Sequence, residues 1–249
     1  MMLTRFMPMI TAVALLAGCS GSAQPTIDKS NAAQARLQLG LAYLARGDMK
    51  SAHQNLERAI GYAPNDYQTQ MGMALYSQQV GENDSAEHYY QRALSLSPNN
   101  RRILNNYGAF LCSLRQYDAA HQQFSAAINL SDSSQVADSL ENAGYCFLQA
   151  NQVSEAKVML ARAFKIDPNK GVAMLIESEQ LFEQGKHPQS KTLLDIYQHE
   201  LPASAHSLWL NIRFAALDEN QRDINGYGEQ LAQHFPHSTQ YQQFLANEY

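Results

Sequence analysis

The chain has 249 residues, of which 45% are hydrophobic and 16% charged, and its formal net charge is −5. This length allows one large domain or two small ones, with enough apolar material for a continuous core. The acidic balance, without a basic stripe, argues against nucleic acid as a partner. The composition therefore directs attention to protein surfaces as partners.

Residues 1–18 have the pattern of a secretory signal segment. Arg5 supplies a positive charge, and the apolar stretch 6–17 is too short to span a bilayer as a stable anchor. Residues 16–19 read LAGC, which is similar to the lipobox of bacterial lipoproteins. The alternative is an ordinary signal peptide followed by a chance cysteine. We expect cleavage before Cys19 and its acylation, which would anchor the mature protein firmly to a membrane.

Residues 19–31 are predicted to form a flexible tether that follows the lipid anchor. They are small and polar and are interrupted by Pro25, a composition that is typical of linkers. By resemblance to lipoproteins of Gram-negative bacteria, Ser20 after the acylated cysteine implies sorting to the outer membrane, on its periplasmic side.

A period of 34 residues runs through the rest of the chain. Small residues recur within each unit, so that Gly40 and Ala52 of the first unit return as Gly108 and Ala120 of the third. A proline stands near the end of five units: Pro64, Pro98, Pro168, Pro202 and Pro236. This pattern resembles the tetratricopeptide repeat (TPR). The resemblance implies an all-α right-handed superhelix of six helix pairs plus a C-terminal capping helix, whose inner face binds other chains.

The predicted units differ in how well they keep this pattern. They cover residues 32–66, 67–100, 101–136, 137–170, 171–204 and 205–236, and residues 237–249 form the capping helix. In the first unit the small triad is Gly40, Ala52 and Ala59, where we expect the two helices to cross most closely. Units five and six are degenerate. Their triads read Ser178, Ser190 and Tyr197, and Ile212, Ile224 and Leu231.

Two cysteines remain if Cys19 carries the lipid. Cys112 and Cys146 each lie in the first helix of consecutive units, so the two helices should be neighbours. We expect them to form a disulfide, because the expected compartment is oxidising. The alternative is two buried free thiols that act as small hydrophobic side chains.

The sequence carries no pattern of catalytic or metal-binding residues. It has no HExxH motif, no paired CxxC, no glycine-rich phosphate loop and no nucleophile elbow. His53, His88 and His121 recur at nearly one position of the second helices, where we expect exposure to solvent. We therefore predict a protein that is not an enzyme and that needs no cofactor, metal or small-molecule substrate.

The expected inner face is apolar at its N-terminal end and polar further along. The first two units place five apolar side chains at inner positions of their first helices: Leu37, Leu41, Leu44, Met71 and Leu75. One interpretation is that the folded-back tether covers them. The other is an exposed apolar groove, which on a soluble domain usually marks a partner site.

Two stretches, residues 105–112 (NNYGAFLC) and 141–146 (ENAGYC), go beyond a general repeat pattern. Together with the lipobox, the tether and the six units, they resemble the PilF/PilW family of type IV pilus lipoproteins, the secretin pilotins. The resemblance implies a non-enzymatic lipoprotein on the periplasmic face of the outer membrane. It also implies that the protein promotes localisation and multimerisation of the pilus secretin. We expect a segment of the secretin to bind in the apolar groove.

Two other functions fit parts of the sequence. A general periplasmic TPR adaptor for envelope assembly or cytochrome maturation would share the repeats, but the lipobox and the two cysteine motifs argue against it. A TPR-bearing enzyme such as a periplasmic protease would need a catalytic domain, and six units leave no residues for one.

Overall fold

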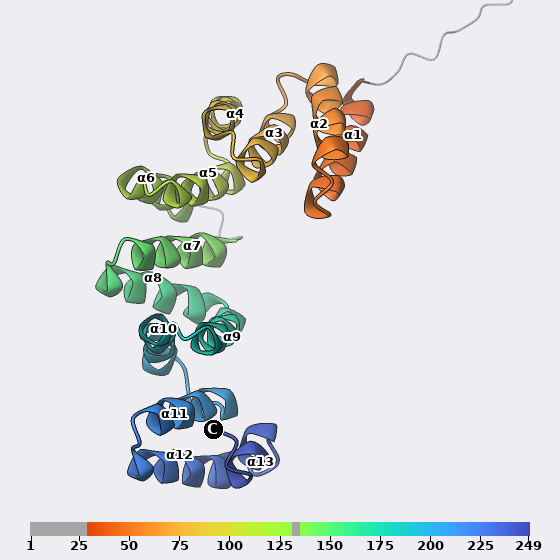
Figure 1. Ribbon diagram of the computed structural model, residues 1–249. Helices are drawn as coiled ribbons and strands as arrows, with labels where there is room; N and C mark the ends of the chain where they lie inside the picture. Colours follow the sequence, from red (N-terminus) through yellow and green to blue (C-terminus); the bar gives the residue numbers. More distant parts are fainter. Residues whose placement is uncertain (1–28, 131–134) are drawn as a thin grey trace, which may run out of the picture.

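The computed structural model describes residues 29–130 and 135–249, and all thirteen regular elements in them are α-helices (Figure 1). The first helices of the pairs are α1 (Lys29–Ala45), α3 (Tyr67–Gln79), α5 (Arg101–Ser113), α7 (Val136–Gln149), α9 (Asn169–Glu183) and α11 (Ala205–Leu217). The second helices are α2 (Met49–Tyr62), α4 (Asn83–Leu96), α6 (Tyr117–Ile128), α8 (Val153–Ile166), α10 (His187–Glu200) and α12 (Gln221–His234). The last helix, α13 (Thr239–Leu245), follows the sixth pair.

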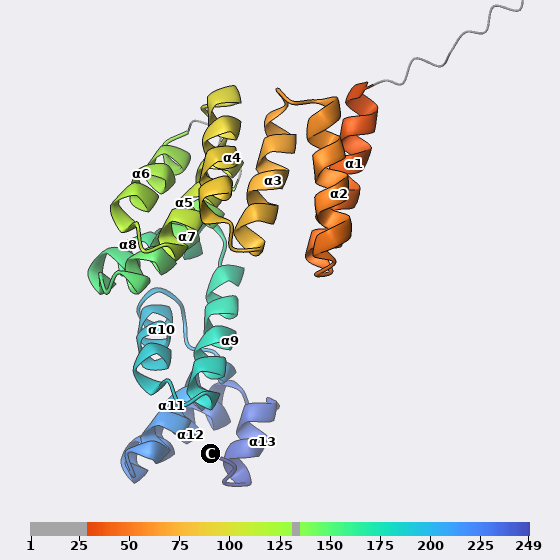
Figure 2. The same cartoon turned by 45° about the horizontal axis from the view of Figure 1, so that its top comes forward.

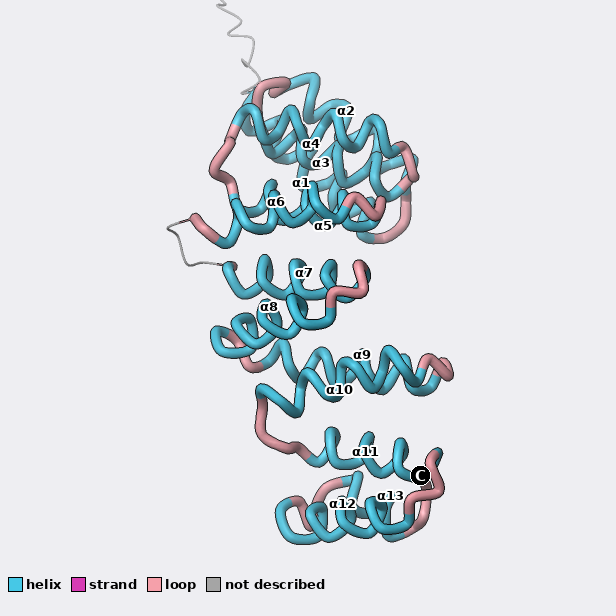
Figure 3. Tube along the Cα trace, turned by 90° about the vertical axis from the view of Figure 1, so that its left-hand side faces the viewer, coloured by secondary structure: helices cyan, strands magenta, loops and turns pink. Residues whose placement is uncertain are grey.

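The helix pairs stack one after another along an elongated, curved molecule (Figures 1 and 2). The pair α1–α2 lies at one end of the stack (Figure 1), and α12 and α13 lie at the other (Figure 3). This arrangement confirms the predicted all-α superhelix of six pairs and a final helix. None of the helices in the described part of the chain is both long and apolar enough to span a membrane.

Some helix boundaries differ from the predicted units. Helix α1 begins at Lys29, inside the stretch predicted to be tether, and α9 begins at Asn169, inside the predicted fourth unit. Pro168 stands directly before α9, where its missing N–H costs little because no helical hydrogen bond would use it. The predicted signal segment, Cys19 and most of the tether lie outside the described residues, as do residues 131–134 between α6 and α7.

The two helices of a pair meet at a small residue on one helix and a large residue on the other. A Cβ atom at Gly40 would lie 2.7 Å from Cγ of Leu56, and one at Gly108 would lie 2.8 Å from Cε1 of Phe124. Leu56 and Phe124 are at most 1% exposed, so neither side chain has free space to move aside. The recurring small residues are therefore required by packing, as the sequence predicted.

The turn inside each pair places one residue in the left-handed backbone region. Gly47, Gly81 and Gly185 have φ of 77°, 80° and 71°. The remaining three turns put Arg115, Asn151 and Glu219 at the same position, with φ between 52° and 61°. Glycine adopts this conformation without a steric penalty. The other three residues adopt it because the repeat geometry demands it, whatever the residue type.

The fifth unit keeps the close crossing with different residues. Ser178 and Ser190 are fully buried, and the Ser178 hydroxyl lies 2.7 Å from the backbone oxygen of Ser190, to which it donates. This hydrogen bond satisfies a polar group that would otherwise be costly to bury. Tyr197 replaces the last small residue of the triad. A Cβ atom at Gly171 would lie 3.5 Å from the Tyr197 ring, an ordinary contact distance, but would overlap Cδ1 of Leu201. The glycine therefore makes room for Leu201, which follows α10.

The sixth unit reverses the sizes at its crossing. The large residue, Ile212, lies on α11, and the small residue, Gly228, lies on α12. A Cβ atom at Gly228 would overlap the ring of Phe244 from α13. Tyr241 and Tyr249 pack around the same cluster. The last helix therefore covers the apolar end of the stack, which would otherwise face water.

Candidate partner-binding surface

The predicted groove at the first two units is wrong for two of its five residues. Leu37 is 4% exposed and Met71 is 3% exposed. The Leu37 side chain packs beside Gly72 of the next unit, and Met71 packs against Ile103 of the unit after it. This position of a first helix therefore faces the neighbouring unit and belongs to the core between repeats.

The other three predicted groove residues keep part of their surface. Leu41, Leu44 and Leu75 are half-buried. Leu41 packs at the edge of the cluster around Leu56, and Leu75 packs at the edge of the next cluster along the stack. The apolar surface at this end of the molecule is therefore smaller than the sequence predicted.

The two cysteines that were predicted to form a disulfide lie together at the junction of units three and four. The structure pairs Cys112 of α5 with Cys146 of α7, with their Cα atoms 5.9 Å apart. This separation lies within the range of protein disulfides. Both side chains are almost fully buried, so a covalent link here would join two repeats through their common core.

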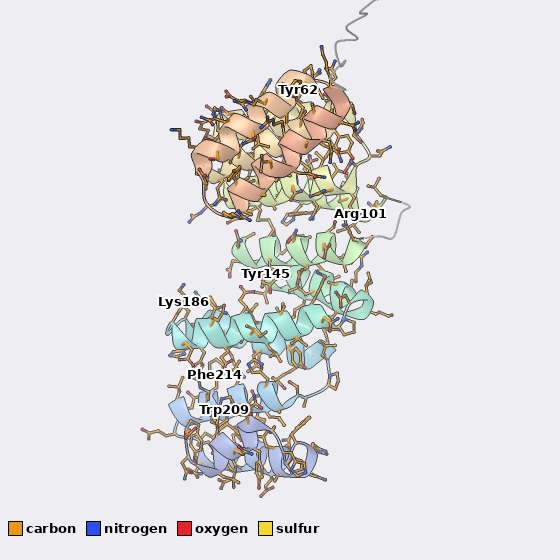
Figure 4. The ribbon with its side chains drawn as sticks, turned by 90° about the vertical axis from the view of Figure 1, so that its right-hand side faces the viewer. Tyr62, Arg101, Tyr145, Lys186, Trp209 and Phe214 are labelled. Carbon is orange, nitrogen blue, oxygen red and sulfur yellow. A yellow bond between two sulfur atoms is a disulfide. The ribbon has the colours of Figure 1, made fainter. Side chains whose placement is uncertain are left out.

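A groove that the sequence analysis missed lies between units four and five. It has a volume of about 540 Å³ and opens between α7, the start of α8, and the helices α9 and α10. Its apolar walls are formed by Tyr145, Leu148, Val153, Leu181, Pro188 and Leu193. Tyr145 lies in the space between α7 and α9 in Figure 4. Tyr145 and Leu148 are inner-face positions of the fourth unit, but their apolar character alone did not predict an opening.

A tyrosine and a carboxylate form the polar part of this groove. Tyr145 and Glu177 both line it. Burial raises the pKa of Tyr145 well above its ordinary value, and the nearby carboxylate of Glu177 raises it further. The hydroxyl therefore stays protonated at neutral pH and is a hydrogen-bond donor in the groove.

Ion pairs link the first helices of units four, five and six. Lys170 lies 2.7 Å from carboxylate oxygens of both Asp138 and Glu141. Further along, Arg213 contacts Glu179 and Glu183. Lys170, the one lysine of α9, and Arg213, the one arginine of α11, are thus each held by two carboxylates.

Two of the three recurring histidines, His53 and His121, are half-buried and not exposed as predicted. His121 stacks on Phe147 of the next unit with ring centroids 3.7 Å apart, and among the described residues neither ring nitrogen has a hydrogen-bond partner. Burial lowers the pKa of His121, although the charge of Asp118 opposes the shift. His88 is exposed and His53 is half-buried. His53, like His121, stacks on an aromatic residue of the following repeat, Tyr76, and a pattern within one helix does not reveal such a contact.

The described residues hold no cluster of three or more His, Cys, Asp or Glu side chains that could bind a metal ion. What the surface does offer is an extended stack of helices, a mixed apolar and acidic groove, and half-buried leucines at the N-terminal end. These features suit contacts with another polypeptide.

Comparisons with known proteins agree with this architecture. Tetratricopeptide repeat models match residues 33–66, 67–100 and 89–122. The chain is 30% identical over 236 residues to the type IV pilus assembly protein PilF of Pseudomonas aeruginosa, covering 93% of this chain and 94% of that protein.

Solved structures of the same kind are also similar. The structure of Pseudomonas aeruginosa PilF matches with a TM-score of 0.61 and 29% identity, over 88% of this chain and 99% of that one. PilW, a widely conserved type IV pilus biogenesis factor, matches with a TM-score of 0.59 and 25% identity, over 86% of this chain and 98% of its own. A TPR protein of Parabacteroides merdae, at 14% identity and a TM-score of 0.53, shares the fold.

The helix pairs and the repeat matches define a TPR scaffold protein, a class that works by binding other proteins. Within that class, the chain belongs to the PilF/PilW family of type IV pilus biogenesis proteins. It is therefore a non-enzymatic protein of pilus biogenesis that acts through protein–protein interaction within the pilus machinery.

Replacing both Cys112 and Cys146 by alanine should lower the free energy of unfolding by about 3–4 kcal/mol, because a disulfide restricts the unfolded chain. The measurement is a thermal melt with and without reductant. Reductant should destabilise the unsubstituted protein and leave the double variant unchanged. Two alkylatable thiols in protein prepared without reductant would contradict the disulfide.

Stability should fall on acidification through the usual titration range of histidine. Because the pKa of folded His121 is depressed, the unfolded chain binds a proton at higher pH than the folded one. The contribution of His121 to stability is complete above about pH 6.5 and is lost as the pH falls through the unfolded and then the folded pKa.

Thermal melts at about pH 7.5 and about pH 5.5 measure this contribution, since the two values bracket the ordinary pKa of histidine. His121→Phe keeps the ring contact and removes the titrating group, so its melting temperature should change less between the two conditions. The control is His88→Gln, which removes an exposed histidine. An unchanged pH dependence in His121→Phe would show that this histidine does not contribute.

Proposed function

We propose that this protein is an outer-membrane lipoprotein that promotes localisation and multimerisation of the type IV pilus secretin, the role of a pilotin. The observation that carries the proposal is the match to PilF along nearly the whole chain, combined with the lipobox at residues 16–19. Acylated Cys19 would hold the protein at the membrane, and Ser20 after it supports the outer membrane as destination.

The physical basis of this role is effective concentration. A lipid-tethered adaptor that binds a monomeric outer-membrane subunit confines it to the membrane surface, where subunits meet far more often than in the free periplasm. The elongated stack of repeats supplies a large surface for such binding (Figure 1). No bond has to be made or broken, so the role suits a non-enzymatic scaffold.

Part of the predicted N-terminal groove remains a candidate for the secretin contact. Leu41, Leu44 and Leu75 keep exposed surface, and they lie in the units that follow the tether. A secretin segment bound there would be close to the membrane that it must enter. Leu37 and Met71 support this surface from beneath and are not contact residues.

Removal of the anchor tests the proposal in a strain that lacks its own copy of the gene. The unsubstituted protein should fractionate with the outer membrane and restore secretin multimers on a gel. Cys19→Ser should appear as a soluble periplasmic protein and restore fewer multimers, because the local concentration effect is lost. Ser20→Ala, which keeps the cysteine, serves as the matched control.

Two results would contradict the proposal. Normal secretin multimers in the strain without the gene would show that the protein has no part in this assembly. Equal sedimentation of the Cys19→Ser protein with the outer membrane would show that the anchor lies elsewhere.

A further inference from the structure

The groove between units four and five lies at a junction that has no counterpart of the disulfide between units three and four. At the preceding junction, Cys112 and Cys146 meet across α5 and α7. One repeat further along the chain, the equivalent positions are Leu148 and Gln180, which are 36 and 34 residues on. Gln180 is exposed and makes no comparable contact. Leu148 is left at the wall of the groove.

The apolar part of the groove is accessible. Leu148 and Leu181 are half-buried and pack at the edge of the core cluster that includes Leu160 and Met174. Val153 and Pro188 complete the rim with further apolar surface. An aliphatic side chain of a partner would therefore find apolar contacts on more than one side and would displace water from them.

The charged part of the groove is negative. Glu177 lines it and lies close enough to Tyr145 to affect its pKa, and a carboxylate offers about four acceptor positions. Glu141 lies close enough to affect Tyr145 electrostatically, and Asp138 stands beside it. Lys170 is the cation bound at these two carboxylates, whereas Glu177 is the one charged residue that lines the groove itself.

This combination selects the chemistry of the partner. A second anion would be repelled, and a purely apolar segment would leave Glu177 partly desolvated without a counter-charge. A lysine or arginine places an apolar stem along the leucines and a cationic head at the carboxylate. Guanidinium and ammonium groups both form strong charge-assisted hydrogen bonds with such an acceptor.

We propose that the groove binds a segment of a partner protein in which a lysine or arginine lies next to an aliphatic residue. The cationic group contacts Glu177, and the aliphatic side chain packs against Leu148 and Leu181. That the partner is a pilus protein rests on the proposed function, whereas the chemistry of the groove does not.

The probe is a fluorescein-labelled synthetic peptide, Gly-Ser-Ala-Leu-Lys-Leu-Ala-Ser-Gly, titrated with the full mature protein and followed by fluorescence anisotropy. The matched probe has norleucine in place of lysine, which keeps the stem and removes the charge. We expect saturable binding of the lysine peptide that weakens as salt is added. The norleucine peptide should bind about tenfold more weakly, because the ion pair is lost.

Two variants with the same change in net charge separate the groove from the general acidity of the protein. Glu177→Gln removes the charge and keeps a side-chain oxygen as hydrogen-bond acceptor, so it should weaken binding of the lysine peptide by about tenfold. Glu229→Gln changes an exposed residue on α12 and should leave binding unchanged. A thermal melt of each variant confirms that it is folded.

Equal binding of the two peptides to the unsubstituted protein would overturn the proposal without the use of any variant. Absence of saturable binding, or equal losses in Glu177→Gln and Glu229→Gln, would overturn it as well. The yield of secretin multimers in cells is measured separately from peptide binding. If Glu177→Gln loses the peptide but the cells form normal multimers, the groove assignment stands and its partner is not the secretin.

Discussion

The close crossing of two helices within each repeat is the contact on which the rest of the structure depends. A small residue on one helix receives a large, fully buried side chain from the other, as Gly40 receives Leu56 and Gly108 receives Phe124. This short distance fixes the angle and separation of the two helices, because a buried side chain cannot move aside. Six such pairs, each placed against the next, produce the elongated stack.

The same constraint determines which side chains remain for binding. Side chains at the crossing and between neighbouring repeats are buried in the core, as Leu37 and Met71 are. What remains on the surface are half-buried leucines near the N-terminal end and the groove at the junction of units four and five. The paired cysteines lie one junction earlier. A junction with paired cysteines therefore stands next to one with a groove, which suits a scaffold that must hold its shape while it binds a partner.

Repeat period and residue size were sufficient to predict the helices, their pairing and the role of the small residues. The two degenerate units depart from this rule, since Ser178 and Ser190 are hydrogen-bonded at the fifth crossing and Gly228 of the sixth unit receives Phe244 from α13. Contacts between repeats were harder to predict. The burial of Leu37, the stacking of His121 on Phe147 and the groove beside Leu148 all depend on how one repeat faces the next. No pattern within a single helix records that relation.

The most direct test of this account is the stability of a protein with one added methyl group at a crossing. In Gly108→Ala the new Cβ would lie within 3 Å of the buried Phe124 ring, so the free energy of unfolding should fall by about 1–3 kcal/mol. Gly226→Ala adds the same group to α12, where nothing lies within 4 Å, and should raise stability by up to about 1 kcal/mol. Chemical denaturation of the two variants beside the unsubstituted protein measures both changes. Equal stability of the two variants would contradict the claim that the close crossing holds the repeats together.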